Sequence, residues 1–186
     1  MPIIQTEIPG LVIFEPTVFE DPRGYFFESY NEQTFAALGI HIRFVQDNQA
    51  KSSYGVIRGL HYQLLPNAQT KLVRAVSGRI LDVAVDIRTG SPTYGRVFSI
   101  ELTAENKKQL LVPQGFAHGY SVLSETAEVM YKCDAFYNKQ AEGGIIYNDP
   151  ALAIDWQIPA DKALVADKDL LYPGIEQCTH NFIYQG

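Results

Sequence analysis

The sequence predicts an all-β protein, and three observations lead to that prediction. Aromatic residues make up 12% of the 186 residues, and aromatic side chains favour the pleated surface of a strand. Short strand-like segments, about ten in all, alternate with turn residues along the chain. The sequence contains no Gly-x-Gly-x-x-Gly motif and no phosphate-binding loop, which disfavours the α/β nucleotide-binding folds. We therefore expect a single domain over residues 1–186 that forms a β-sandwich or β-barrel.

Composition narrows the range of partners. The net charge of −6 argues against binding to nucleic acid or to an anionic membrane, although a few local cations are enough to bind a small anion. No apolar run reaches the roughly 18 residues of a membrane span, and the first residues lack the basic and apolar regions of a secretory signal. We therefore expect a cytoplasmic protein. Cys133 and Cys178 make only a weak case for a disulfide.

The N-terminal third is predicted to hold short strands and one helix. Asn31 has the residue type of a helix N-cap and Gly39 that of a helix stop. A turn is predicted at residues 21–24, where aspartate, proline and glycine gather. In chain order we expect strands at Leu11–Phe14, Thr17–Phe19 and Gly24–Tyr30, a helix at Glu32–Leu38, and a strand at Arg43–Gln49.

The middle of the chain is predicted to form a hairpin that carries chemistry. Val56–Gln63 forms one strand, and Thr70–Arg74 forms the next after a proline-asparagine turn. This hairpin would bring His61 close to Arg58 and Lys71. A titratable base would then lie beside two cations.

The second half continues the β pattern. Arg79–Arg88 alternates so that Leu81 and its apolar neighbours share one face, while Asp82 and Asp86 share the other. We expect the apolar face to join the core and the acidic face to meet solvent or a wet pocket. The remaining segments predicted are strands at Arg96–Leu102, Gln109–Val112 and Glu128–Cys133, and a short helix within Ala160–Leu171.

One motif resembles the cupin superfamily. Pro113-x-Gly115-x-x-His118 matches one half of the cupin signature, and Gly55 precedes His61 at the spacing of the other half. The resemblance implies a jelly-roll β-barrel with a few short peripheral helices. Where cupins place a second histidine this chain has Gln63, a poor ligand for a transition metal, and Lys71 is a cation close by. We therefore expect neither a metal nor a cofactor.

A narrower resemblance covers residues 8 to about 169. Seven motifs in order resemble the dTDP-4-dehydrorhamnose 3,5-epimerase family: Phe44–Asn48, Val56–Gln63, Asn67–Lys71, Asp82–Arg88, Ser91–Thr93, Leu102–Lys107 and Pro113–Gly119. The resemblance implies a dTDP-linked 4-keto-6-deoxyhexose as the substrate. It also implies inversion at C3 and C5, which needs a base, an acid across the ring and a group that stabilises an enolate.

The resemblance assigns four catalytic residues. His61 matches the base, Lys71 the cation that faces the ketone oxygen, and Tyr131 the acid. Asp169 matches the carboxylate that orients the histidine, with Asp167 as its rival. The structural alternatives are a packed core histidine for His61, a strand-end lysine for Lys71 and a buried aromatic for Tyr131.

The resemblance also assigns substrate contacts and a partner. Arg23 and Arg58 suit a diphosphate, because guanidinium groups pair with phosphate oxygens, and Tyr137 suits stacking on thymine. Asp82 could support either His118 or His61. A homodimer is implied, in which the strands around residues 23–28 reach the partner's site. The full set of substrate-binding positions is Arg23, Glu28, Gln46, Asn48, Arg58, His118, Tyr137, Glu142 and Lys168.

Three alternatives remain open from sequence. The first is a 3-epimerase or ketoisomerase acting on the same kind of nucleotide sugar. The second is a metal-dependent cupin oxygenase or isomerase, against which Gln63 counts. The third is a non-catalytic cupin that binds a nucleotide sugar, which the joint presence of base, cation and acid disfavours.

Overall fold

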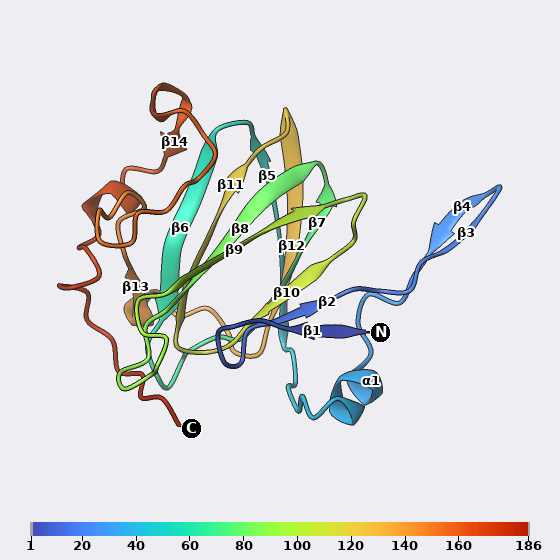
Figure 1. Ribbon diagram of the computed structural model, residues 1–186, viewed down its shortest axis with the longest axis horizontal. Coiled ribbons are helices and arrows are strands. Elements are labelled where there is room, and N and C mark those ends of the chain that lie inside the picture. Colours follow the sequence, from blue (N-terminus) through green and yellow to red (C-terminus); the bar gives the residue numbers. More distant parts are fainter. Residues whose placement is uncertain (1, 186) are drawn as a thin grey trace.

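The computed structural model describes residues 2–185, and its main feature is a pair of facing β-sheets (Figure 1). The first sheet has the order β1 (Ile3–Gln5), β2 (Val12–Phe14), β10 (Gln109–Val112), β7 (Lys71–Ser77), β12 (Thr126–Cys133) and β5 (Gln46–Ser53). The second has the order β13 (Glu142–Gly144), β6 (Val56–Gln63), β11 (Phe116–Val122), β8 (Arg79–Asp86) and β9 (Val97–Thr103). A short strand, β14 (Leu164–Val165), pairs in parallel with β6. This is the expected jelly roll.

Helices are short and lie outside the sheets. They are α1 (Glu32–Ala37) and the 3-10 helices η1 (Lys139–Ala141), η2 (Ala160–Lys162) and η3 (Asp169–Leu171). The side chain of Asn31 caps α1 by accepting hydrogen bonds from the backbone of its first turn, as its residue type predicted. None of the helices in residues 2–185 has the length and apolar character needed to cross a membrane.

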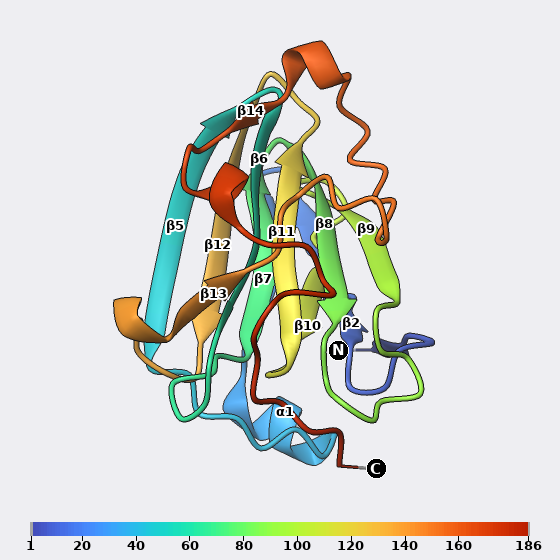
Figure 2. The same cartoon turned by 90° about the vertical axis from the view of Figure 1, so that its left-hand side faces the viewer.

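The second sheet separates two apolar layers. Ile80 and Ala84 of β8 point between the sheets, whereas Leu81, Val83 and Val85 point outward. The outer layer is covered by the C-terminal segment, which crosses in front of β6 and β11 in Figure 2. Both faces of β8 are therefore buried. Of the two surroundings expected for its acidic face, solvent is excluded, and Asp82 instead lies behind His118, which lines the internal cavity.

The strands of the expected central hairpin do not pair with each other. β6 pairs with β11, β13 and β14 in one sheet, whereas β7 pairs with β10 and β12 in the other. The connection after Gln63 is thus a corner between the sheets and not a hairpin turn. His61 and Lys71 nevertheless line the same cavity, because each lies on a strand whose inner face points into the barrel.

Several element boundaries differ from the expected ones. The strand expected at Arg43–Gln49 is β5, displaced to Gln46–Ser53 because its polar residues pair along β12. The helix expected within Ala160–Leu171 is instead η2, β14 and η3, since residues 164–165 add to the edge of β6. Cys133 and Cys178 are both free in the part of the chain that the structure describes.

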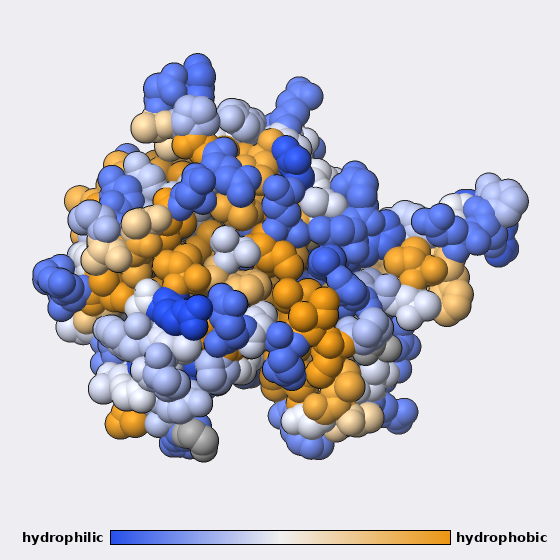
Figure 3. All heavy atoms as spheres, viewed as in Figure 1, coloured by the Kyte–Doolittle hydropathy of each residue, from blue (hydrophilic) through white to orange (hydrophobic). Residues whose placement is uncertain are grey.

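A two-stranded arm projects from the barrel. It consists of β3 (Phe19–Asp21) and β4 (Gly24–Phe26), so the aromatic strand expected over Gly24–Tyr30 is shorter than predicted (Figure 1). Phe19 and Phe26 are 63% and 70% exposed. Figure 3 shows apolar side chains on this arm behind a polar tip. Exposed phenylalanines on a projecting arm suit contact with another surface.

Candidate active site

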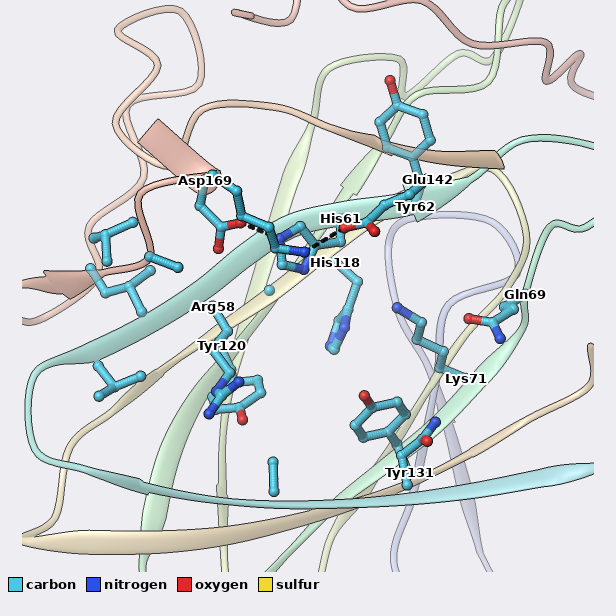
Figure 4. Close-up of a pocket in the computed structure, with 18 of the residues that line it drawn as sticks. Arg58, His61, Tyr62, Gln69, Lys71, His118, Tyr120, Tyr131, Glu142 and Asp169 are labelled. Carbon is cyan, nitrogen blue, oxygen red and sulfur yellow. Dashed lines mark hydrogen bonds and ion pairs between the residues drawn. The ribbon is translucent and has the colours of Figure 1, made fainter. Parts of the chain in front are cut away.

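A cavity of about 880 Å³ opens at the barrel interior and collects most of the candidate residues (Figure 4). Strands of both sheets line it, together with the C-terminal segment. All the sequence-predicted site residues line this cavity except Arg23 and Glu28: they are Gln46, Asn48, Arg58, His61, Lys71, His118, Tyr131, Tyr137, Glu142, Lys168 and Asp169.

Arg23 and Glu28 lie elsewhere. Arg23 is at the tip of the arm, where its guanidinium is paired with the carboxylate of Asp21. Glu28 follows the arm and accepts a hydrogen bond from the Asn31 side chain at 3.0 Å. Neither residue is brought into the cavity of its own chain.

An irregularity in β6 puts Arg58 and His61 on the same side of the strand. Residues three apart normally point to opposite faces of a strand. Here His61 lies opposite His118 and Arg58 opposite Tyr120, so three steps on β6 match two on β11. This is a β-bulge, and Gly59 adopts a φ of +122° within it.

Two glycines make the bulge possible. A Cβ atom on Gly59 would lie 2.6 Å from the Cα of Gly119, and a Cβ on Gly119 would lie 2.6 Å from the Arg58 carbonyl oxygen. Both distances are too short for any side chain, so the two backbones approach closely only because both residues are glycine. Gly59 in the motif around His61 is thus required by the close approach of the two backbones.

His61 is paired with a buried carboxylate. Its Nε2 lies 2.8 Å from Oδ1 of Asp169, a residue only 2% exposed, while Asp167 is exposed to solvent. Burial by itself would raise the pKa of Asp169, but the hydrogen bonds from His61 and from the backbone of Gly59 outweigh burial and hold the pKa below its usual range. The carboxylate is therefore ionised and can only accept, so we assign the proton of neutral His61 to Nε2. Nδ1 is then the free basic nitrogen.

A second histidine–carboxylate pair lies next to the first. His118 sits opposite His61 on β11, and its Nε2 lies 2.8 Å from Oδ1 of Asp82 on β8. This answers a question that the sequence left open, because Asp82 supports His118 and not His61. The other oxygen of Asp82, Oδ2, is buried without a hydrogen-bond partner among residues 2–185.

Lys71 and Tyr131 face these histidines from the opposite sheet (Figure 4). The Nζ atom of Lys71 lies 5.8 Å from the centre of the Tyr131 ring. Burial lowers the pKa of Lys71 and raises the pKa of Tyr131. A protonated phenol and a lysine whose charged form is poorly solvated therefore lie across the cavity from the base.

The rim of the cavity is organised around Glu142. Its carboxylate accepts hydrogen bonds from Tyr137 Oη at 2.6 Å, Lys168 Nζ at 2.6 Å and Tyr172 Oη at 3.0 Å. Burial would raise the pKa of Glu142, but these donors, Lys168 first, lower it to about 2. Sequence reasoning missed Tyr172. Its only signal was a lone tyrosine before a proline, which indicates no site.

Gln63 has a structural task at the position where cupins place a second histidine. Its Nε2 donates to the carbonyl oxygen of Asn67 at 2.7 Å, and its Oε1 accepts from the backbone of Asn138 at 2.7 Å. The amide thus holds the corner after β6 against the loop after β12. With this amide committed and the Lys71 ammonium in the same cavity, the residues present do not fit a divalent metal.

The fold and these side chains define a class of protein: a jelly-roll enzyme with the groups needed for acid–base chemistry. Comparison with known proteins agrees. The model of the dTDP-4-dehydrorhamnose 3,5-epimerase family matches residues 5–177. The chain belongs to this family.

Individual relatives are similar over nearly the whole chain. The dTDP-4-dehydrorhamnose 3,5-epimerase of Shigella flexneri is 54% identical over 91% of this chain and 93% of its own. The crystal structure of the Elizabethkingia anophelis epimerase has a TM-score of 0.90 at 52% identity, covering 95% of this chain and 97% of that one. The Legionella pneumophila enzyme, in complex with dTDP-4-keto-L-rhamnose, has a TM-score of 0.95 at 44% identity, covering 100% of this chain and 99% of that one.

Proposed function

We propose that this protein is the 3,5-epimerase that converts dTDP-4-dehydro-6-deoxy-D-glucose to dTDP-4-dehydro-L-rhamnose, in the synthesis of dTDP-L-rhamnose. Membership of the family supports the reaction. The observation that carries the proposal is the cavity itself, in which the His61–Asp169 pair on one sheet faces Lys71 and Tyr131 on the other.

The chemistry of the substrate explains why these groups are needed. The hydrogens on C3 and C5 are acidic because both carbons are next to the C4 ketone. In our proposal Nδ1 of His61 removes one of them, and the Asp169 carboxylate stabilises the imidazolium that forms. The electrons move onto the ketone oxygen as an enolate, whose charge the Lys71 ammonium offsets. By analogy with an oxyanion-hole donor this is worth about 3 kcal/mol.

Inversion requires the proton to return from the other face of the ring. Tyr131 is proposed to donate it, since its strand lies across the barrel from β6 and burial keeps its phenol protonated. One inversion leaves His61 protonated and Tyr131 as phenolate. Both must exchange protons with water before the second carbon can be inverted.

The remaining cavity residues are proposed to hold the nucleotide. Arg58 is the cavity's guanidinium and is proposed to pair with the diphosphate. Tyr137 is 56% exposed at the rim, where a thymine ring could stack on it. Gln46, Asn48, Glu142 and Lys168 supply polar contacts, and His118 lies beside the sugar.

We further propose a homodimer in which the arm of one chain completes the site of the other. The position of Arg23 and Glu28 outside their own cavity supports this, as do the exposed phenylalanines of the arm. An Arg23→Ala chain and a His61→Asn chain should each be weak alone. Mixed in equal amounts and allowed to exchange, they should recover about a quarter of wild-type activity, because half of the dimers then contain one complete site. No recovery in dimers shown to have exchanged would mean that Arg23 serves its own chain.

The test of the main proposal is proton NMR of dTDP-4-keto-6-deoxyglucose with the protein in heavy water, with and without a chelator. Deuterium entering at both C3 and C5, unaffected by the chelator, supports a metal-independent 3,5-epimerase. Label at C3 alone would identify a 3-epimerase instead. No label at all would refute the proposal and favour a binding protein. The cytoplasmic location stays a prediction from the sequence.

A further inference from the structure

Tyr172 has no part in the reaction proposed above, yet it touches two groups that do. It directly follows η3, the 3-10 helix that begins with Asp169. Its ring meets the His61 ring edge to face, with centres 5.8 Å apart and planes at 68°. Its hydroxyl donates to Oε1 of Glu142 at 3.0 Å. One side chain therefore joins the proposed base to the carboxylate at the cavity rim.

The place of the ring is prepared by a glycine. Gly144 lies opposite His61 on β13, and a Cβ atom there would be 2.5 to 2.7 Å from three carbons of the Tyr172 ring. The ring therefore rests directly on bare backbone beside the histidine. The next residue, Pro173, is fixed as well, because its carbonyl oxygen accepts a hydrogen bond from the backbone of Ile146 at 2.9 Å.

The His61 ring needs such a neighbour. Its hydrogen bond to Asp169 fixes one nitrogen but leaves the ring free to tilt about that contact. A misplacement of about 1 Å at a reacting group can cost about 100-fold in rate. The edge-to-face packing of Tyr172 opposes this tilt, and such an aromatic pair is worth about 0.5–1.5 kcal/mol.

We infer that Tyr172 is a positioning residue that holds the His61 ring with its own ring and Glu142 with its hydroxyl. Tyr172 thereby couples Glu142, at the end of the cavity proposed to hold the nucleotide, to the proposed base His61. The inference rests on the proposed function. It adds a residue that contacts His61 and Glu142 but is not among the residues that line the cavity. Its two contacts are separable, because phenylalanine keeps the ring and loses only the hydroxyl.

The two contacts predict different kinetics. Tyr172→Phe leaves the ring against His61 and removes one of the three donors to Glu142, so kcat should stay within about twofold while KM rises about threefold. Tyr172→Ala removes the ring as well, so kcat should fall by about tenfold or more. Restoration of kcat by phenylalanine separates positioning from a merely structural role.

Gly144→Ala tests the same contact from the other side. All functional side chains remain, but the new methyl group must displace the Tyr172 ring. We expect kcat to fall by about as much as in Tyr172→Ala. Adding Gly144→Ala to Tyr172→Ala should cost no more than about a further twofold, since the ring that would clash is gone. If the losses of kcat in the two single variants multiplied in the double variant, Gly144 and Tyr172 would act independently and the inference would be overturned.

A second readout is independent of turnover. The chain has four histidines, so a protein labelled with ¹³C at histidine gives a small set of ring signals, and His61→Asn assigns one of them. Tyr172→Ala should shift and broaden the His61 signals. The matched control is Tyr94→Ala, which removes a tyrosine ring 6.0 Å from His180 and should change only the His180 signals.

The outcomes separate the two proposals. If wild-type protein leaves the dTDP sugar unchanged, the proposed function fails, while the His61 signals still decide whether Tyr172 positions the ring. Unchanged His61 signals in Tyr172→Ala would overturn the inference, whatever the activity. An active Tyr172→Ala variant with wild-type kcat and melting temperature would overturn it as well.

Discussion

The two histidine–carboxylate pairs have the same contact and different surroundings. Both join Nε2 to a carboxylate oxygen at 2.8 Å. His118 and Asp82 lie on adjacent strands of one sheet, and their side chains are 8% and 0% exposed. His61 takes its partner from the C-terminal segment and keeps 26% of its side chain exposed. The His118–Asp82 pair lies within one sheet and is enclosed, whereas the His61–Asp169 pair leaves its histidine open to the cavity.

This difference assigns unequal roles to two chemically similar pairs. A base must reach a proton on the substrate, so the more exposed histidine is the better candidate. The enclosed pair is better suited to support the wall beside it. The predictions below test this division, beginning with the largest effect.

His61→Asn should lower kcat by about 10³- to 10⁴-fold, because the amide cannot accept the proton. His118→Asn is the matched variant on the neighbouring strand, and its loss of kcat should be at least tenfold smaller. Turnover of the dTDP sugar followed by NMR measures both, with melting temperature as the check on folding. Equal losses would mean that the two pairs share the base role.

Tyr131→Phe should slow net inversion by about 10²-fold or more, because the proton can no longer return from the face opposite His61. Exchange of the same proton with heavy water should continue, since His61 can still remove it and put it back. Comparing deuterium entry with product formation measures the two rates. A parallel loss of both would remove Tyr131 from the acid role.

Asp169→Asn should lower kcat by about 10²-fold, because the amide no longer stabilises the imidazolium. Asp82→Asn should affect kcat less than tenfold. It should instead lower the unfolding free energy by about 1–3 kcal/mol, since a buried charge-assisted hydrogen bond is weakened. Measurement of kcat and of urea unfolding for both variants forms the test. A larger loss of kcat in Asp82→Asn than in Asp169→Asn would contradict the division of roles.

The smallest effect concerns Glu142 at the rim. Its pKa in the folded protein is about 2 against an ordinary value of 4.5, so it stabilises the fold fully above pH 4.5 and loses this contribution as the pH falls toward 2. In Glu142→Gln the unfolding free energy should lack this loss between pH 4.5 and pH 2. Urea unfolding at pH 7, 4.5 and 3 should show the stability difference between wild type and variant shrinking only below pH 4.5. A constant difference would contradict it.

The sequence predicted which residues line the cavity better than it predicted how the strands that carry them are paired. Lys71 could be assigned because it lies on a regular strand at the end of a local motif, and Tyr131 because the resemblance gives its position on another regular strand. The pairing of β6 and β7 could not, because short separation along the chain suggests a hairpin even where the connection turns a corner between sheets. Which strand pairs with which depends on the whole barrel.

Two further features were beyond sequence reasoning. The bulge in β6 depends on Gly59 and Gly119, which lie far apart along the chain and meet only in the folded sheet. The segment that carries Asp169 and Tyr172 has little regular structure, so neither helical nor strand periodicity indicates where its side chains lie. Asp169 was reached through a resemblance, and Tyr172 was not reached at all.

The bulge acts as a phase shift in the alternation of β6. Before it, Ile57 points to the outer apolar layer and Arg58 inward; after it, Leu60 and Tyr62 point outward and His61 inward. If the same residues followed a regular alternation without the bulge, the strand would aim His61 at the outer layer. A deletion of one residue between Arg58 and His61 would remove the bulge and leave two steps on β6 opposite two on β11, so both side chains would still point inward. The inward aim of the proposed base therefore depends on the bulge that absorbs the extra residue, and with it on the two glycines that allow the bulge.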